Sequence, residues 1–309
     1  MIENAFQLGD PVEHRGVVVT PLFPLADPRA AYLTLEEATP RGLRIEEISS
    51  SGSVPELRVV NPLAENVLLY DGEELVGAKQ NRILNVSVLV GAGKELPIPV
   101  SCVEQGRWRH VSPAFAPASH AAHPELRRRK AESLRLDPLA RGVSQGDVWD
   151  EVREKNMRMD VRSSTGASAD AYRRWQEPLV ELERAFPLQP GQAGAVLALA
   201  EDVCLDYVSR PDAFERLYPK LLRGYMLDAL ERLDQRPSEK TVDAFVHEVV
   251  SAQTTRRPSA GLGHDLRLEG AGAVGSGLEL EDELLQLSAF TSGRERRTFG
   301  RIARPSRRA

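Results

Sequence analysis

Short apolar runs, each closed by a turn residue, dominate the first hundred residues of the chain. Residues 17–20 are a β-branched run that ends at Pro21, and the run 57–61 ends at Pro62. Runs of this length and composition are typical of β-strands. We therefore predict that the N-terminal part is rich in strands. Two further stretches fit a helix or strands equally well, residues 33–37 and residues 43–48.

The strongest turn signal follows the apolar run 66–70. This run leads directly into Asp71-Gly72, a dipeptide that favours a two-residue hairpin because both turn positions need φ > 0. Residues 83–90 are again largely apolar, two glycines turn the chain, and residues 95–102 return as a proline-containing strand. This order predicts a meander of antiparallel strands.

Beyond Trp108 the composition changes. Residues 112–124 are rich in proline, alanine, serine and histidine, which indicates a linker or a long loop. Apolar residues then recur at helical spacing in four stretches, the second disturbed by Pro178 and the last capped by Ser238. The predicted helices span residues 145–159, 169–186, 212–233 and 238–252.

The last part of the pattern mixes both kinds of structure. Residues 195–207 are rich in alanine, which favours a helix, yet the apolar runs on either side of Glu201-Asp202 fit a tight hairpin. After Arg257 the chain is rich in glycine, and polar and apolar residues alternate as in strands. The alternating segments are residues 265–269, 278–281 and 285–288.

Together these elements predict an α+β fold. Its N-terminal part is rich in antiparallel strands, its middle is helical, and short strands near the C-terminus return to the sheet. We expect a single domain over residues 1–291, followed by a basic disordered tail over residues 292–309. Within the domain we distinguish a β-rich part (1–110), a linker (111–124) and a helical or mixed part (125–291).

Composition restricts the setting in which the protein works. The chain of 309 residues is 41% hydrophobic and 28% charged, as in soluble proteins. It has no apolar run near the roughly 18–20 residues that span a membrane, and its N-terminus lacks the features of a signal peptide. Two cysteines are too few for a disulfide framework. We therefore expect a cytoplasmic protein without a membrane partner.

The charge is divided unevenly along the chain. Of the formal net charge of −5, residues 292–309 carry +6, from seven arginines and one glutamate, which leaves −11 on the remainder. An acidic body argues against nucleic acid as the partner of the folded part. The tail alone has the composition of a segment that docks on nucleic acid or an acidic protein, or of a plain solvated end.

Two polar segments interrupt the apolar strands and are the first candidates for a functional site. The first polar segment, residues 71–82, has the sequence Asp-Gly-Glu-Glu-Leu-Val-Gly-Ala-Lys-Gln-Asn-Arg. The second, residues 101–108, has the sequence Ser-Cys-Val-Glu-Gln-Gly-Arg-Trp. Alternate residues of a strand share a face, so Cys102 and Glu104 are expected to point together. Charged and amide groups at strand positions indicate a site built on a β scaffold.

These side chains suit an anionic ligand. We assign Glu104 and Lys79 as catalytic candidates, because a carboxylate beside a lysine can act as an acid/base pair. Arg82 is expected to hold a phosphate or carboxylate with its planar guanidinium. Alternatively, Lys79 and Arg82 pair with nearby glutamates in a structural polar seam, and Cys102 is a small buried residue. The other ligand-binding candidates of the two segments are Gln80, Asn81, Cys102 and Arg107.

A third candidate lies near the end of the predicted domain. Residues 261–267 combine two glycines with His264, Asp265 and Arg267, which we add to the ligand-binding set. Such a composition brings backbone amides and charges to an anion, and it is equally typical of a plain loop before a strand. Its spacing fits neither a dinucleotide-binding motif nor a Walker motif.

Familiar catalytic and metal-binding signatures are absent from the sequence. It contains no Gly-x-Ser-x-Gly, His-Glu-x-x-His or Cys-x-x-Cys pattern, so serine hydrolases, zincins and zinc ribbons lose their usual support. His120 and His123 stand near Glu125, but their proline- and alanine-rich surroundings provide no rigid frame. We assign no metal ligands, and the cofactor stays unknown.

The two polar segments resemble a known family. The resemblance is carried by residues 77–82, Gly-Ala-Lys-Gln-Asn-Arg, with residues 71–73 before them and residues 99–104 and 106–108 after them. They are similar to the ADP-ribosylglycohydrolase-and-rhodanese-phosphatase-associated protein domain family, and the resemblance extends from about residue 6 to residue 290. Because the family is defined by the enzymes that accompany it, the resemblance implies a nucleotide-derived or phosphorylated ligand and assigns no reaction.

Two classes of function are consistent with these observations. In the first, the chain binds or processes an anionic small molecule of the nucleotide or ADP-ribose type. Glu104 then serves as acid/base, Lys79 and Arg82 clamp the anion, and the residues near 264 complete the site. In the second, the chain is a non-catalytic scaffold or partner protein for enzymes that handle ADP-ribose or phosphate. The lack of a recognisable nucleophile–base pair leaves open whether the protein is an enzyme.

Overall fold

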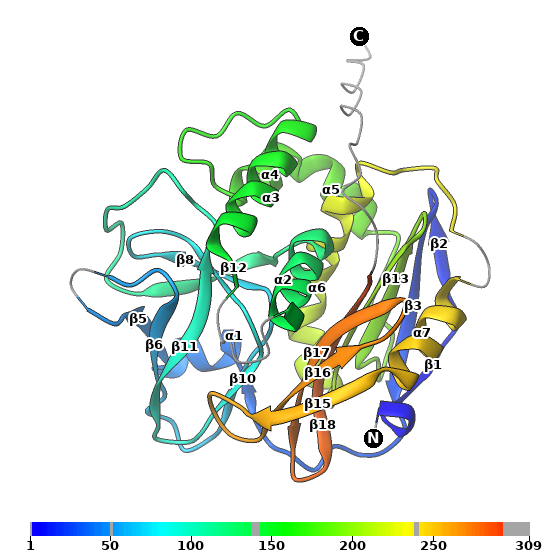
Figure 1. Ribbon diagram of the computed structural model, residues 1–309, viewed down its shortest axis with the longest axis horizontal. Coiled ribbons are helices and arrows are strands. Elements are labelled where there is room, and N and C mark those ends of the chain that lie inside the picture. Colours follow the sequence, from blue (N-terminus) through cyan, green and yellow to red (C-terminus); the bar gives the residue numbers. More distant parts are fainter. Residues whose placement is uncertain (1, 50–51, 137–142, 238–240, 293–309) are drawn as a thin grey trace.

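The structure, a computed structural model, describes residues 2–49, 52–136, 143–237 and 241–292. Strands lie on two sides of the molecule, and helices α2 (Pro124–Leu136) and α6 (Pro211–Ala229) lie between them (Figure 1). The basic tail predicted for residues 292–309 lies, beyond Ser292, outside the described residues. So does Ser238, the expected cap of the last helix.

Most strands lie toward the two ends of the chain and most helices in its middle, where the strands β13 and β14 separate α5 from α6. The strands are β1 (Phe6–Leu8), β2 (Val12–His14), β3 (Val17–Pro24), β4 (Leu33–Thr34), β5 (Arg44–Glu47), β6 (Glu56–Val60), β7 (Val67–Leu69), β8 (Glu73–Gly77), β9 (Arg82–Leu84), β10 (Val88–Val90), β11 (Glu95–Cys102), β12 (Phe115–Ala121), β13 (Gly194–Leu199), β14 (Asp202–Val208), β15 (Gln253–Pro258), β16 (His264–Glu269), β17 (Ala273–Leu280) and β18 (Glu283–Thr291). The remaining helices are α1 (Leu35–Ala38), α3 (Gln145–Arg158), α4 (Ala169–Arg174), α5 (Gln176–Glu183) and α7 (Thr241–Ser251), with 3-10 turns at Ile2–Asn4 and Thr39–Arg41.

The largest sheet joins the two ends of the described chain. Its nine strands are antiparallel and lie in the order β1-β3-β13-β14-β18-β17-β16-β15, with β2 paired to β3. The C-terminal strands thus return to a sheet that also contains N-terminal strands. The predicted α+β fold is confirmed.

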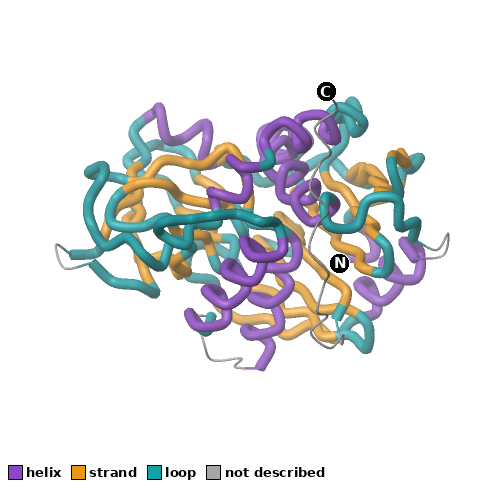
Figure 2. The backbone as a smooth tube through the Cα atoms, turned by 90° about the horizontal axis from the view of Figure 1, so that it is seen from above, coloured by secondary structure: helices purple, strands orange, loops and turns teal. Residues whose placement is uncertain are grey.

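Residues 195–207, which fitted either a helix or a hairpin, form the hairpin β13–β14. Leu197 and Leu199 pack in the core that contains α6, whereas Val196 and Ala198 pack in the core that contains α7. Helices therefore cover both faces of this sheet (Figure 2). Because alternate residues of a strand face opposite sides, a strand covered on both faces is apolar throughout and lacks the alternation of a half-exposed strand.

The two polar segments lie in the other part of the fold. A six-stranded sheet has the order β12-β8-β9-β11-β6-β5, and it shares an apolar core with a three-stranded sheet of order β10-β7-β4. The hairpin predicted at Asp71-Gly72 is wrong. The chain turns there, with φ +83 at Gly72 and the Glu73 amide donating to the Tyr70 carbonyl oxygen. However, β7 and β8 belong to different sheets, because the apolar residues of β7 complete the core beside β10.

The helical middle matches the sequence pattern with one omission and one shift. Helix α2 was not predicted, because its buried face carries Arg127 and Lys130 beside apolar residues. Helix α3 begins after Ser144, whose hydroxyl caps the Asp147 amide. The stretch 169–186 divides into α4 and α5 at Trp175 rather than at Pro178. Pro178 is the third residue of α5, where the missing N–H is not needed for the helix. Within the described residues no helix is long and apolar enough to cross a membrane.

The segment expected to be a linker contains β12. This strand lies at the edge of the six-stranded sheet and pairs with β8, with an irregularity between Pro117 and Ala121. A proline is tolerated on an edge strand, so the composition typical of a loop is also compatible with this position. The stretch 33–37 divides into β4 and the start of α1, and the stretch 43–48 contains β5.

Candidate functional site

The two polar segments meet in the six-stranded sheet. β8 ends at Gly77, residues 78–81 turn the chain, and Arg82 at the start of β9 pairs with Cys102 of β11. Gly77 has φ +124, and a Cβ atom there would lie 2.4 Å from Ser112 Oγ. Only glycine permits this conformation with so close a neighbour. It allows the sharp turn that places the two polar segments side by side.

Glu104 is held by three donors. Its Oε2 accepts hydrogen bonds from Arg107 Nε at 2.8 Å and from the Asn81 amide at 3.2 Å. Its Oε1 accepts one from the Thr165 hydroxyl at 3.0 Å. Arg107 also donates to Asn81 Oδ1 at 3.0 Å and to the Ala78 carbonyl oxygen at 2.9 Å. These contacts close the turn.

The same contacts set the protonation state of Glu104. Burial alone would raise the pKa of this carboxyl, but the hydrogen bonds from Arg107 and from the Asn81 amide outweigh it, and the pKa lies below its ordinary value. Glu104 is therefore an ionised acceptor at neutral pH. Its role as acid/base stays a prediction, and proton transfer to a ligand would require one of the three donors to give way.

Asn81 links this group to a second buried carboxylate. Its Nδ2 donates to Glu74 Oε1 at 3.1 Å, and Glu74 Oε2 lies 3.0 Å from His120 Nε2. The His120 ring stacks on Tyr172 with the centroids 3.8 Å apart. The side-chain nitrogen and oxygen of Asn81 are thus both bonded to protein groups. Sequence reasoning did not connect Glu74 and His120 with this site, because their contact depends on the pairing of β8 with β12.

Gln80 connects Glu104 with Arg82. Its Nε2 donates to the Glu104 carbonyl oxygen at 2.9 Å. Its Oε1 accepts hydrogen bonds from Arg82 Nη1 at 2.9 Å and from the Cys102 thiol at 3.1 Å. Burial raises the pKa of the Cys102 thiol, so this group is protonated at neutral pH and acts as a buried donor.

Arg82 is bonded less completely than these neighbours. Its side chain is fully buried, yet Nε and Nη2 have no hydrogen-bond partner among the described residues. Burial lowers the pKa of Arg82 even though the nearby negative charge of Glu47 favours the cation. Buried polar groups in folded proteins are nearly always bonded, so a guanidinium with two unused donors is able to bind an acceptor that a ligand supplies.

Trp108 places an aromatic ring beside two cations. The ring is 49% exposed, and its centroid lies 5.3 Å from Lys79 Nζ and 5.8 Å from Arg82 Cζ. Both distances are within the range of cation–π attraction. An exposed ring next to two positive charges suits a ligand in which an anionic group is attached to a planar one.

Glu47, at the end of β5, lies beside Lys79 and Trp108 and was not among the candidates predicted from the sequence. A Cβ atom on Gly52 would lie 3.3 Å from both Glu47 Oε2 and Trp108 Cζ2, and 3.2 Å from Lys79 Cδ, so the three side chains converge there. Both carboxylate oxygens of Glu47 are buried without a donor among the described residues. Consecutive glutamates at the end of a strand were the available signal, because one of the two must face inward.

His264, Asp265 and Arg267 lie in a different place. They belong to β16 of the nine-stranded sheet, where Arg267 Nη2 is 3.6 Å from Asp265 Oδ2. Burial lowers the pKa of Arg267 to about 10. Arg82, in contrast, belongs to β9 of the six-stranded sheet, so the residues of β16 stand on a different sheet from the two polar segments.

A buried polar cluster joins the two parts of the fold. Arg127 of α2 donates to both oxygens of Asp206 of β14, at 2.6 and 2.7 Å. The hydroxyls of Tyr70 and Tyr225 donate to the same carboxylate, at 2.7 and 2.5 Å. Lys130 of α2 donates a hydrogen bond to Asp71 of the first polar segment. Since the Asp206 oxygens are fully used by protein donors, this cluster is structural.

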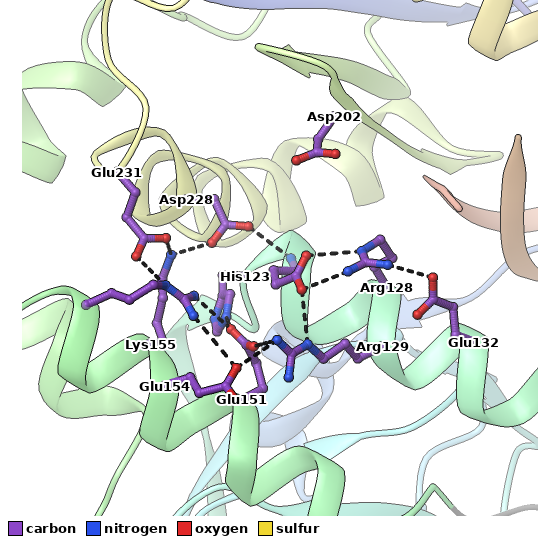
Figure 3. Close-up of polar contacts among 12 residues, drawn as sticks. His123, Arg128, Arg129, Glu132, Glu151, Glu154, Lys155, Asp202, Asp228 and Glu231 are labelled. Carbon is purple, nitrogen blue, oxygen red and sulfur yellow. Dashed lines mark hydrogen bonds and ion pairs between the residues drawn. The ribbon is translucent and has the colours of Figure 1, made fainter. Parts of the chain in front are cut away.

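A second ionic cluster lies where α2, α3 and α6 meet (Figure 3). Lys155 Nζ lies 2.6 Å from Asp228 Oδ1 and 2.6 Å from Glu231 Oε2. His123 Nε2 lies 3.1 Å from Glu151 Oε1. The charges at this junction are paired mainly with one another. Helical spacing between acidic and basic residues in α2 and α3 was the sequence signal for such a cluster.

This junction offers neither room for a nucleotide nor, among its described residues, an evident metal site. A cavity of about 30 Å³ borders Asp228, Arg128 and Asp202, which is room for a water molecule or two but not for a nucleotide. Among the described residues no three His, Cys, Asp or Glu side chains are grouped so that they could hold a metal ion.

Comparison with known proteins identifies the family. No curated protein and no solved structure matches the chain. One family profile matches residues 5–290, and its description is the ARG and Rhodanese-Phosphatase-superfamily-associated Protein domain, ARPP-1. The match covers nearly all of the domain predicted from the sequence and confirms the resemblance of the two polar segments. The chain therefore belongs to the ARPP-1 family.

Proposed function

We propose that this protein binds an anionic small molecule of the nucleotide or ADP-ribose type, with Arg82 as the main ligand of the anionic group. The observation that carries the proposal is the fully buried guanidinium of Arg82, whose Nε and Nη2 are unused by the described residues. These two donors lie on one edge of the guanidinium, the edge that binds carboxylates and phosphates in a bidentate manner.

Electrostatics supports an anion at this position. Taking a cation out of water without bonding its donors is unfavourable, and an acceptor with negative charge offsets that cost. Lys79 adds a second positive charge near the same ring, while the carboxylate of Glu104 is already paired with Arg107. Because Arg82 is fully buried, the ligand reaches it only after the covering side chains have moved.

Trp108 and the family indicate what accompanies the anionic group of the ligand. An exposed aromatic ring binds the flat face of a base, and stacking on such a ring is worth about 1–3 kcal/mol per base. The family is named for its association with ARG and rhodanese-phosphatase proteins, which supports a nucleotide-derived or phosphorylated ligand.

The remaining residues of the two segments position these groups. Gln80 orients Arg82, and Asn81 with Arg107 holds the turn that carries Lys79. If the protein also converts the ligand chemically, Glu104 is our candidate for the acid/base, because Gln80 joins its main-chain carbonyl oxygen to Arg82 and so keeps this residue close to the proposed anion. The residues on β16 have no part in this proposal.

Titration calorimetry with ADP-ribose, AMP and inorganic phosphate tests the proposal. We expect at least one of the three to bind, and Arg82→Met to weaken that binding by about 3 kcal/mol, or roughly a hundredfold. Arg58→Met is the matched control. Arg58 lies in the same sheet on β6 but is half exposed and pairs with Glu46 and Glu95, so its loss should leave the affinity unchanged.

Two results would contradict the proposal. One is the absence of binding by all three compounds, and the other is binding that Arg82→Met leaves intact. Either result would favour the alternative role of a scaffold or partner protein. In that case the polar segments would stabilise the fold or form an interface, and a partner enzyme should be recovered in a stable complex with the full chain.

A further inference from the structure

The charges around Arg82 also restrict what accompanies the anionic group. We propose that Glu47 selects ligands that carry hydroxyl donors beside the anion, which makes a sugar phosphate the preferred class. This inference rests on the proposed anion site at Arg82, and it adds a residue and a chemical requirement that the anion site alone does not supply.

The position of Glu47 follows from strand geometry. Glu46 and Glu47 are consecutive on β5 and therefore face opposite sides of the strand. Glu46 Oε1 bonds to Arg58 Nη2 at 2.5 Å on one side. Glu47 turns to the other side, where its Oε2 lies near Trp108 and its charge acts on Arg82.

The unused hydrogen-bonding groups on Glu47 and Arg82 are complementary. Glu47 offers two buried carboxylate oxygens without donors, and Arg82 offers two buried N–H groups without acceptors, within the described residues. Although they are of opposite charge and both lie beside the Trp108 ring, the two side chains make no hydrogen bond to one another. A group that lies between them satisfies both only if it has acceptors on one side and donors on the other.

A phosphate alone does not meet this requirement. At neutral pH the phosphate group of a monoester is largely a dianion that presents acceptors only, and a carboxylate nearby repels it. Hydroxyl groups on the adjoining carbon atoms provide the missing donors, because the two oxygens of a carboxylate can accept from two neighbouring hydroxyls. A phosphate ester whose carbon chain carries several hydroxyl groups therefore uses both residues. An alkyl phosphate uses Arg82 and leaves Glu47 without donors.

A metal ion does not fit the same position. A cation bound by Glu47 would lie close to Lys79 and Arg82, whose positive charges oppose it. The local charges therefore favour a sugar over a metal ion beside Glu47.

Binding of three phosphates to the full chain tests the inference. The probes are inorganic phosphate, n-butyl phosphate and ribose 5-phosphate, each titrated into the wild type, Glu47→Gln and Glu46→Gln. We expect the wild type to bind ribose 5-phosphate at least about tenfold more tightly than n-butyl phosphate. Glu47→Gln should abolish most of this preference and at the same time leave n-butyl phosphate bound equally or more tightly, because a repulsive charge is removed.

These opposite changes distinguish recognition from a structural effect. A variant that merely disturbs the site would weaken all three probes together. Glu46→Gln, which alters the neighbouring residue on the other face, should retain the wild-type preference.

The same titrations distinguish failure of the Glu47 inference from failure of the anion site at Arg82. If inorganic phosphate binds in an Arg82-dependent manner but ribose 5-phosphate has no advantage, or keeps its advantage in Glu47→Gln, the inference is wrong and the anion site stands. If none of the probes binds the wild type, the anion site and the inference both fail.

Discussion

Two buried arginines of this protein differ in how completely they are bonded. Arg127 donates to both oxygens of Asp206 and to the Ser288 hydroxyl, and its Nε alone lacks a partner among the described residues. Its guanidinium lies 5.2 Å from the ring of Phe290. Arg82 donates to Gln80 and leaves two nitrogens unused by the described residues. The acidic partner raises the pKa of Arg127, whereas burial lowers that of Arg82. The first arrangement is typical of a structural contact and the second of a position that awaits a ligand.

Removal of each guanidinium should therefore have unequal effects on stability. Arg127→Met leaves a buried carboxylate without its cation and is expected to lower the free energy of unfolding by about 3–5 kcal/mol. Arg82→Met removes a desolvated cation that makes few bonds and should change the same quantity by less than about 1 kcal/mol. Urea denaturation without added ligand measures both.

The two stability changes can also contradict the proposed binding role of Arg82. If Arg82→Met destabilises the protein as strongly as Arg127→Met does, then Arg82 is a structural residue and the polar-seam interpretation is correct. A large loss for Arg127→Met together with a small one for Arg82→Met agrees with a binding role.

The sequence singled out the two polar segments that the structure brings together, but not which of their groups are already bonded. Lys79, Arg82 and Trp108 could be singled out because charged and aromatic residues interrupt apolar strands. Which of the polar groups are already bonded depends on distant partners, such as Thr165 for Glu104. Local sequence does not contain this information, and the same reason explains why Glu47 was missed.

At the scale of elements, the pattern succeeded where one face of an element is exposed. Helix α3 was located to within a residue because its apolar positions recur at helical spacing. It was ambiguous for β13 and β14, whose faces are both covered, and misleading for β12, whose edge position tolerates proline. The hairpin predicted at Asp71-Gly72 failed because a turn sequence does not determine which strands pair.

The junction of α2, α3 and α6 should make stability depend on pH. Burial would raise the pKa of Asp228, but Lys155 outweighs it and holds the pKa of this carboxyl well below its ordinary value. A carboxyl with a lowered pKa in the folded state stabilises the protein above its ordinary pKa near 4, and this contribution is lost as the pH falls below that value. We expect the contribution of Asp228 to be on the order of 3 kcal/mol.

Urea denaturation of the wild type and Asp228→Asn between pH 7 and pH 2 measures this contribution. The difference in unfolding free energy should be largest at pH 7 and should shrink toward pH 2. Asp150→Asn, which removes an exposed ion pair from α3 at the same junction, should show a small difference at every pH. A gap between wild type and Asp228→Asn that stays constant over the range would refute the role of this ion pair.

At the scale of the whole molecule, the two parts of the fold share one continuous structure. The cluster around Asp206 connects β14 with Tyr70, next to the first polar segment, and α2 packs against both parts. One apolar core includes residues from N-terminal strands, helices and C-terminal strands. These connections favour one folding unit rather than separate β-rich and mixed domains.

We therefore predict a single cooperative unfolding transition. In the Trp175→Phe variant, fluorescence comes from Trp108 and Trp149, on the side of the six-stranded sheet. In the Trp108→Phe, Trp149→Phe variant it comes from Trp175, which packs in the core shared with α6. Both signals and the far-ultraviolet circular dichroism should change at the same urea concentration, after allowance for any stability change caused by each substitution. Two separated transitions within one variant would show that the parts unfold independently.

The central claim is that Arg82 receives the anionic group of a ligand, and a crystal structure of the protein grown with ADP-ribose tests it most directly. The account predicts phosphate oxygens within about 3 Å of Arg82 Nε and Nη2, with the ligand in contact with the ring of Trp108. A structure in which only water lies between Arg82 and Glu47, or in which the ligand binds elsewhere, would contradict it.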